Sequence, residues 1–152
     1  MTKRADATQR MLDVLRARGL RITAQRVALV EAFARDTSHP TAQDLYERLL
    51  PEFPSMSFAT VYNTLDALAH AGLSQGLRLG GATRFDPNTS AHHHAVCDAC
   101  GAIVDLPTKT LAPEAGAPRR VRAAAPGFVV DRVERTYRGL CKSCSKKTNK
   151  EN

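Results

Sequence analysis

Four cysteines stand in two closely spaced pairs along the chain. Two residues separate Cys97 from Cys100, and two separate Cys141 from Cys144. This spacing lets both thiolates of a pair reach one tetrahedral ion, and two such pairs complete a closed site that suits zinc. The alternatives are a redox-active disulfide pair and unrelated buried thiols, but without a secretion signal reduced thiols are favoured. The cysteines therefore predict a structural Zn(2+) site.

Three consecutive histidines precede the first cysteine pair. In a strand His92 and His94 point to one face, whereas His93 points to the other face together with Cys97. The imidazoles of His92 and His94 therefore face away from the zinc site. They are available to a different ion, which needs carboxylates as well to complete the nitrogen and oxygen coordination of iron, manganese or zinc.

Two aspartates and one distant histidine are candidates to complete this second site. Asp86 and Asp105 lie on either side of the histidine run, and His39 lies far upstream. Two of the three have a simpler interpretation: His39 precedes a proline in a turn, and Asp86 opens a common turn before Pro87. If all were ligands, one ion would connect an N-terminal domain to a C-terminal one and act as a switch.

Four helices are predicted in the first half of the chain. Each has apolar residues at helical spacing and local start or stop signals, such as a Thr or Ser cap, a following Gly, or a Pro. The predicted helices are Thr8 to about Arg18 before Gly19, Ala24 to Ala34 after Thr23, one that starts at Thr41 with Asp44 in the capping box and ends before Pro51, and Phe58 to His70 after Ser57.

A β-hairpin is predicted directly after these helices. Leu73 to Leu79 and Ala82 to Phe85 flank Gly80 and Gly81, which can adopt the positive φ angles of a two-residue turn. Helices followed by a hairpin predict a winged helix-turn-helix domain. The alternative is a small helical interaction domain with a surface hairpin.

The remainder of the chain is predicted to be a small second domain rich in strands. His92 to Val96 and Ala102 to Leu106 bracket the first cysteine pair, and Phe128 to Leu140 leads to the second. Leu111 to Ala125 is a possible helix, although Pro118 would break it. We therefore expect an α+β protein with these parts: a winged-helix domain at 1–85, a hinge at 86–91, a zinc-stapled α/β domain for dimerisation and metal binding at 92–147, and a disordered tail at 148–152, with solvated residues from Lys146 onward.

Length and charge limit the classes of function. A chain of 152 residues excludes an extended multi-domain enzyme, and its formal charge of +7 makes a polyanionic partner plausible. No stretch approaches the roughly eighteen apolar residues of a membrane span, and the first residues contain no signal-peptide core. We therefore expect a cytoplasmic protein without a membrane partner.

Two motifs resemble those of the ferric uptake regulator family. They are the A-T-V-Y run within Ser57 to Leu65 and the H-x-H-x-x-C-x-x-C-G run from His92 to Gly101, followed by the distant second C-x-x-C. The resemblance extends from about Gly19 to Lys147. It implies a homodimeric, metal-dependent repressor with an N-terminal winged helix and a C-terminal dimerisation domain.

Within the family, the chain looks most like peroxide-sensing regulators of the PerR type. The resemblance implies a regulatory site for Fe(2+) or Mn(2+), in which oxidation of His39 and His92 by peroxide weakens metal binding and releases DNA. Asp105 carries the most weight, because iron-sensing members usually have glutamate there. Val133 stands where many members have the histidine of a further metal site, and Leu111 to Ala125 departs from the usual dimerisation helix. The implied ligands are His39, Asp86, His92, His94 and Asp105.

The last predicted helix is expected to read double-stranded DNA. A tyrosine can pack on a thymine methyl and an asparagine can bond adenine, so an A/T-rich operator is expected, and a dimer favours two-fold symmetry. The base-reading candidates are Ser57, Thr60, Tyr62 and Asn63, and the phosphate-contact candidates are Arg21, Arg26, Arg78 and Arg84.

Two further functions remain as alternatives. One is a regulator of the same family that senses iron, manganese or zinc sufficiency without peroxide chemistry. The other is a zinc-dependent hydrolase that uses histidines to activate water. The hydrolase is disfavoured because the sequence offers no acid or base beyond the ligands, so we expect no enzyme.

Overall fold

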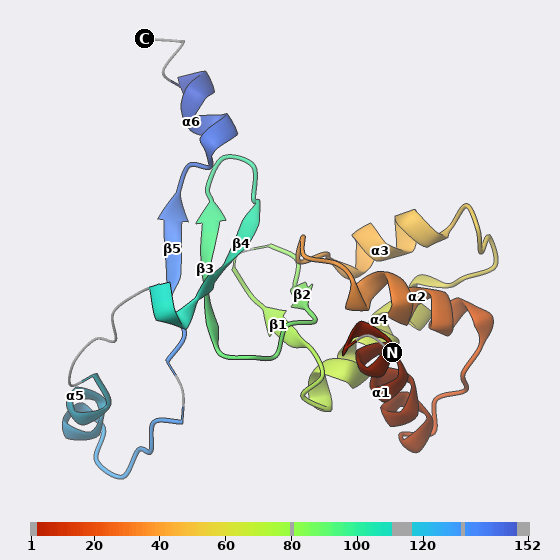
Figure 1. Cartoon of the computed structure of the whole chain (residues 1–152), viewed down its shortest axis with the longest axis horizontal. Helices are drawn as coiled ribbons and strands as arrows, with labels where there is room; N and C mark the ends of the chain where they lie inside the picture. Colours follow the sequence, from red (N-terminus) through yellow and green to blue (C-terminus); the bar gives the residue numbers. More distant parts are fainter. Residues whose placement is uncertain (1–2, 80, 111–116, 132, 149–152) are drawn as a thin grey trace. The chain divides into compact units, whose positions relative to one another are not determined.

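The computed structural model describes residues 3–79, 81–110, 117–131 and 133–148. The chain divides into two compact units, Met1–Thr89 and Ser90–Asn152 (Figure 1). No helix among the described residues has the length and apolar character needed to cross a membrane.

The first unit contains the four predicted helices. Three begin at the expected caps: the side chains of Thr23, Thr41 and Ser57 accept hydrogen bonds from backbone N–H groups of the first helical turn, and Thr41 forms a full capping box with Asp44. The first helix starts earlier than expected, at Lys3. The helices are α1 Lys3–Ala17, α2 Ala24–Ala34, α3 Ala42–Leu49 and α4 Phe58–His70.

Leucine and phenylalanine side chains from all four helices form the core of the first unit. Leu15, Leu29, Phe33, Leu45 and Leu65 have no exposed surface. Burial of each such side chain contributes about 1.5–3 kcal/mol to folding. This core fixes the direction of α4, whose other face carries the predicted DNA-reading residues.

The hairpin of the first unit is shorter than predicted. Its strands are β1 Gln75–Leu77 and β2 Arg84–Asp86, which pair antiparallel. The predicted two-residue turn is wrong, because residues 78–83 connect the strands; Gly81 has φ +84° and Gly80 lies outside the described residues. Asp86, expected at the start of the hinge, is the last residue of β2. Helices followed by this hairpin make a winged helix.

The second unit is built on a three-stranded sheet of order β4-β3-β5 (Figure 1). The central strand β3, His92–Cys97, pairs antiparallel with β4, Ile103–Pro107, and parallel with β5, Thr136–Gly139. A 3₁₀ turn covers Thr108–Thr110. The parallel pairing places Cys97 opposite Gly139, which brings the second cysteine pair to the end of β3.

Two helices of the second unit differ from the sequence-based expectation. Helix α5 is Ala117–Ala124, so Pro118 lies in its first turn, where proline is tolerated, while residues 111–116 of the predicted helix lie outside the described residues. Helix α6 is Lys142–Thr148. This helix includes Lys146 and Lys147, which are exposed, and also Thr148, the first residue of the predicted disordered tail; 149–152 lie outside the described residues.

Candidate metal centres

The four cysteines of the second unit lie together. Their sulfur atoms are within 4.8 Å of one another, and no disulfide joins them. Cys97 ends β3, Cys100 follows in the turn, and Cys141 and Cys144 flank the start of α6. Four thiolates with no other donor type fit a closed zinc site.

Local hydrogen bonds lower the pKa of two thiols of this cluster, those of Cys97 and Cys141, before any cation binds. The backbone N–H of Cys141, 3.3 Å from the Cys97 sulfur, and that of Cys100 lower the pKa of Cys97 to about 6. The backbone N–H of Cys144 lowers the pKa of Cys141. Hydrogen bonds to Cys141 and Cys100 raise the pKa of Cys144 to about 12. Because zinc binds thiolates, the site releases protons as it loads.

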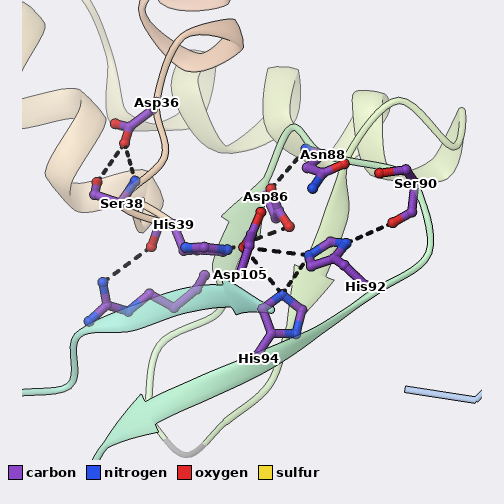
Figure 2. A network of polar contacts seen from close by, with 10 residues as sticks. Asp36, Ser38, His39, Asp86, Asn88, Ser90, His92, His94 and Asp105 are labelled. Carbon is purple, nitrogen blue, oxygen red and sulfur yellow. Dashed lines mark hydrogen bonds and ion pairs between the residues drawn. The ribbon is translucent and has the colours of Figure 1, made fainter. Parts of the chain in front are cut away.

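His92 and His94 form the nitrogen part of a second donor cluster. Their Nε2 atoms are 2.9 Å apart, and both side chains are buried (Figure 2). The Nδ1 of His92 lies 2.7 Å from the Ser90 carbonyl oxygen. Because a carbonyl only accepts, Nδ1 carries the proton and Nε2 presents its lone pair to the cluster, as a metal-ligating histidine does.

Asp105 adds an oxygen donor to this cluster from the neighbouring strand. It pairs in register with His94, and its Oδ1 lies 3.5 Å from His92 Nε2 and 3.9 Å from His94 Nε2. His93 points the other way, where its Nδ1 accepts a hydrogen bond from the Arg135 backbone. Two imidazole nitrogens and a carboxylate fit iron(II) or manganese(II) better than magnesium or calcium.

The first unit contains a matching nitrogen and oxygen pair. His39, in the loop between α2 and α3, has Nε2 3.5 Å from Oδ2 of Asp86 at the end of β2 (Figure 2). The other oxygen of Asp86 accepts the Asn88 N–H at 2.8 Å. His39 adopts φ +55°, a left-handed conformation that is uncommon outside glycine. Such backbone strain costs on the order of 1 kcal/mol and is concentrated at functional sites.

The outward face of α4 carries two of the predicted base-reading residues. Tyr62 and Asn63 are exposed, whereas their neighbours Val61 and Thr64 are buried. The hydroxyls of Ser57 and Thr60 lie 2.9 Å apart within the N-terminal cap. Phe58, one turn before Tyr62, is also exposed, and its ring centroid lies 6.4 Å from that of Tyr62.

The four candidate arginines fall into two groups. Arg21 and Arg78 are exposed. Arg26 donates from Nε to the Thr64 hydroxyl at 3.2 Å, and Arg84 donates from Nη1 to the His39 carbonyl at 3.2 Å. The sequence did not indicate these internal bonds because each partner is distant along the chain.

A winged helix followed by a sheet unit with clustered cysteines and histidines defines a class of metal-binding, DNA-binding regulators. The chain belongs to the ferric uptake regulator family, whose model matches residues 17–119. It is 42% identical over 139 residues to the peroxide operon regulator of Bacillus subtilis, covering 91% of this chain and 93% of that one. It is 37% identical to the peroxide-responsive repressor PerR of Staphylococcus aureus over 88% of each chain.

A solved structure supports the fold independently of close sequence similarity. The ferric uptake regulator Fur of Helicobacter pylori, described as having three functional metal-binding sites, superposes with a TM-score of 0.73 over 95% of both chains. Its identity to this chain is 18%, so this likeness concerns the fold alone.

Proposed function

We propose that the protein is a metal-dependent transcriptional repressor that senses peroxide through oxidation of histidine ligands. The observation that carries the proposal is the convergence of His92 Nε2, His94 Nε2 and Asp105 Oδ1 on the β3–β4 sheet. The similarity to two regulators named for their response to peroxide supports the same signal.

The regulatory metal is proposed to bind His39, Asp86, His92, His94 and Asp105. Each unit contributes nitrogen and oxygen donors, so a single Fe(2+) or Mn(2+) ion would make the position of the DNA-binding unit depend on metal. When bound, iron(II) supplies the redox chemistry that activates hydrogen peroxide. The imidazole of His39 or His92 gains one oxygen atom, and the other oxygen of the peroxide leaves as water. The modified ring is a poorer ligand, which favours release of DNA.

The cysteine cluster is proposed to hold zinc as a scaffold rather than as the sensor. Its four thiolates would fill the coordination of the ion and leave no open position. Thiolates bound in this way are protected from peroxide, so the oxidisable ligands are the histidines.

Double-stranded DNA and a second copy of the chain are the proposed partners. Tyr62 and Asn63 on α4 would read an A/T-rich operator, with exposed Arg21 and Arg78 on phosphates. On the second unit, exposed Val104, Tyr137 and Leu140 line one hollow beside the sheet. Pairing of this apolar face would form a homodimer that contains two copies of α4, which suits a two-fold symmetric operator. The proposed location of this complex is the cytoplasm.

Membership of the ferric uptake regulator family also supports a sensor of iron, manganese or zinc sufficiency. Mass spectrometry distinguishes the two functions. Protein loaded with iron(II) and exposed to low peroxide should gain one oxygen on the peptides that contain His39 or His92. His70, exposed on α4 and outside the ligand set, is the internal control. Loss of DNA binding with unmodified His39 and His92 would contradict peroxide sensing by these residues.

A gel mobility-shift assay tests DNA binding itself. Manganese(II) should produce a shift of promoter DNA that persists after peroxide, because manganese does not reduce peroxide as iron(II) does. The Asp105→Ala variant should remain folded but give no shift at the same manganese concentration. If no divalent metal produces a shift with promoter DNA, the repressor function is wrong and an enzymatic role must be reconsidered.

A further inference from the structure

The loop that carries His39 is fixed at both of its ends. At the start, Asp36 accepts hydrogen bonds from the Ser38 backbone N–H at 2.7 Å and from the Ser38 hydroxyl at 2.6 Å, and also pairs with Arg48. At the other end, the Thr41 N–H donates to Asp44 at 2.8 Å in the capping box. These bonds leave His39 at the middle of the loop, in its left-handed conformation.

Strand β2 holds the middle of this loop. The Phe85 N–H donates to the Pro40 carbonyl at 2.8 Å, and Thr41 forms a β-bridge with Arg84. The Arg84 guanidinium donates from Nη1 to the carbonyl oxygen of His39 itself. The positive charge of Arg84 also helps to lower the pKa of Asp44, after the larger effect of the Thr41 N–H.

Arg84 and Asp86 share one face of β2, because side chains two residues apart in a strand point the same way. Phe85, between them, is buried in the core of the first unit. From their common face, Arg84 contacts the backbone of His39 and Asp86 contacts its ring. Strand β2 therefore contacts both the backbone and the side chain of His39.

We propose that Arg84 is a positioning residue for His39 rather than a phosphate contact. Its hydrogen bond holds the His39 carbonyl in the orientation that the left-handed backbone requires, and the imidazole is then aimed at Asp86. The proposal rests on the proposed role of His39 as a metal ligand. Removal of a group that orients a metal ligand without binding the metal itself typically weakens metal affinity by about 10–100-fold.

Hydrogen exchange in the metal-free, full-length protein tests the positioning without any metal. Arg84→Ala should increase exchange about 10-fold at the amides of Ser38, Thr41 and Phe85, and Arg84→Lys should restore part of the protection. Arg78→Ala, which removes an exposed arginine after β1, is the matched control and should change none of them. Unchanged exchange in both Arg84 variants overturns the proposal.

Measurements of manganese affinity and DNA affinity then distinguish a positioning role of Arg84 from a phosphate contact. Arg84→Ala should weaken manganese(II) binding about 10-fold, yet at saturating manganese it should keep the salt dependence of DNA binding. Arg78→Ala should keep manganese affinity and lower the salt slope by about 1. A lower salt slope in Arg84→Ala with unchanged manganese affinity overturns the proposal. Faster exchange with unchanged manganese affinity supports positioning by Arg84 and instead counts against His39 as a ligand.

Discussion

The carboxylate of Asp44 connects the N-terminal cap of helix α3 to the loop that carries His39. The Thr41 N–H lowers the pKa of Asp44 below 3.8; partial burial opposes this, and the Thr41 hydroxyl and the charges of Arg84 and Arg48 reinforce it. The same contacts begin α3 and end the His39 loop. The helix cap is therefore also a support for the candidate metal ligand.

Replacement of Asp44 by alanine should lower the free energy of unfolding by about 1 kcal/mol at pH 7. A lowered folded-state pKa stabilises the fold above the unfolded value of 3.8, and this contribution is lost as the pH falls through the folded value. The difference in the free energy of unfolding between the wild type and Asp44→Ala should therefore become smaller below about pH 4. Urea titrations followed by helical circular dichroism measure it, with the exposed Glu52→Ala variant as control. A difference that stays constant from pH 7 to pH 3 would contradict this account.

At the scale of elements, a partly buried polar contact connects α4 to α2. The Thr64 hydroxyl donates to the Thr60 carbonyl at 2.6 Å and accepts from Arg26 Nε at 3.2 Å. A second nitrogen of Arg26 donates to the Arg21 carbonyl. Arg26 thus holds α4 and the segment before α2 together, which sets the angle at which Tyr62 and Asn63 are presented.

The Thr64→Val variant should destabilise the first unit by about 1–2 kcal/mol. Valine has the same shape but leaves the Arg26 Nε–H without its acceptor in a partly buried position. Chemical denaturation followed by helical circular dichroism provides the measurement. Thr37→Val, at an exposed position, is the matched control and should change stability by less than about 0.5 kcal/mol. Equal effects of the two substitutions would show that the Thr64 bond contributes nothing.

The elements that the sequence predicted well are those with local signals. Caps such as Thr23 and Ser57 act within one helical turn, and the period of two in β3 separates His92 and His94 from Cys97. The ends of β2 depend instead on pairing with Pro40 and Thr41, which are distant in sequence, and the predicted hairpin is therefore longer than the observed one. Helix α6 was missed because its Lys- and Ser-rich sequence resembles a solvated tail, while its start is set by the cysteine cluster.

At the scale of the whole molecule, the two units draw on different sources of stability. The first unit has a core supplied by every helix. In the described part of the second unit, the buried apolar side chains are those of Val96, Cys97 and Ile103. So small a core gives little stability on its own, and we expect the metal to supply a large part of the remainder.

Removal of zinc should therefore unfold the second unit and spare the first. A strong chelator at mildly acidic pH should expose the amides of β3 and β4 to hydrogen exchange, because structural zinc contributes on the order of 10 kcal/mol to the folding of such sites. The amides of α1 to α4 should stay protected, and addition of zinc should restore the sheet. Persistent protection of β3 and β4 in zinc-free protein would show that the cluster is dispensable for folding.

The parallel pairing of β5 with β3 has a consequence for how the protein is made. Cys141 and Cys144 follow β5 and emerge late in synthesis, long after Cys97 and Cys100. Synthesis must therefore pass Cys144 before the donor set is complete. A polypeptide that terminates before Cys141 would contain helix α4 but only half of the sulfur ligands. Such a truncated polypeptide would lack a complete zinc site.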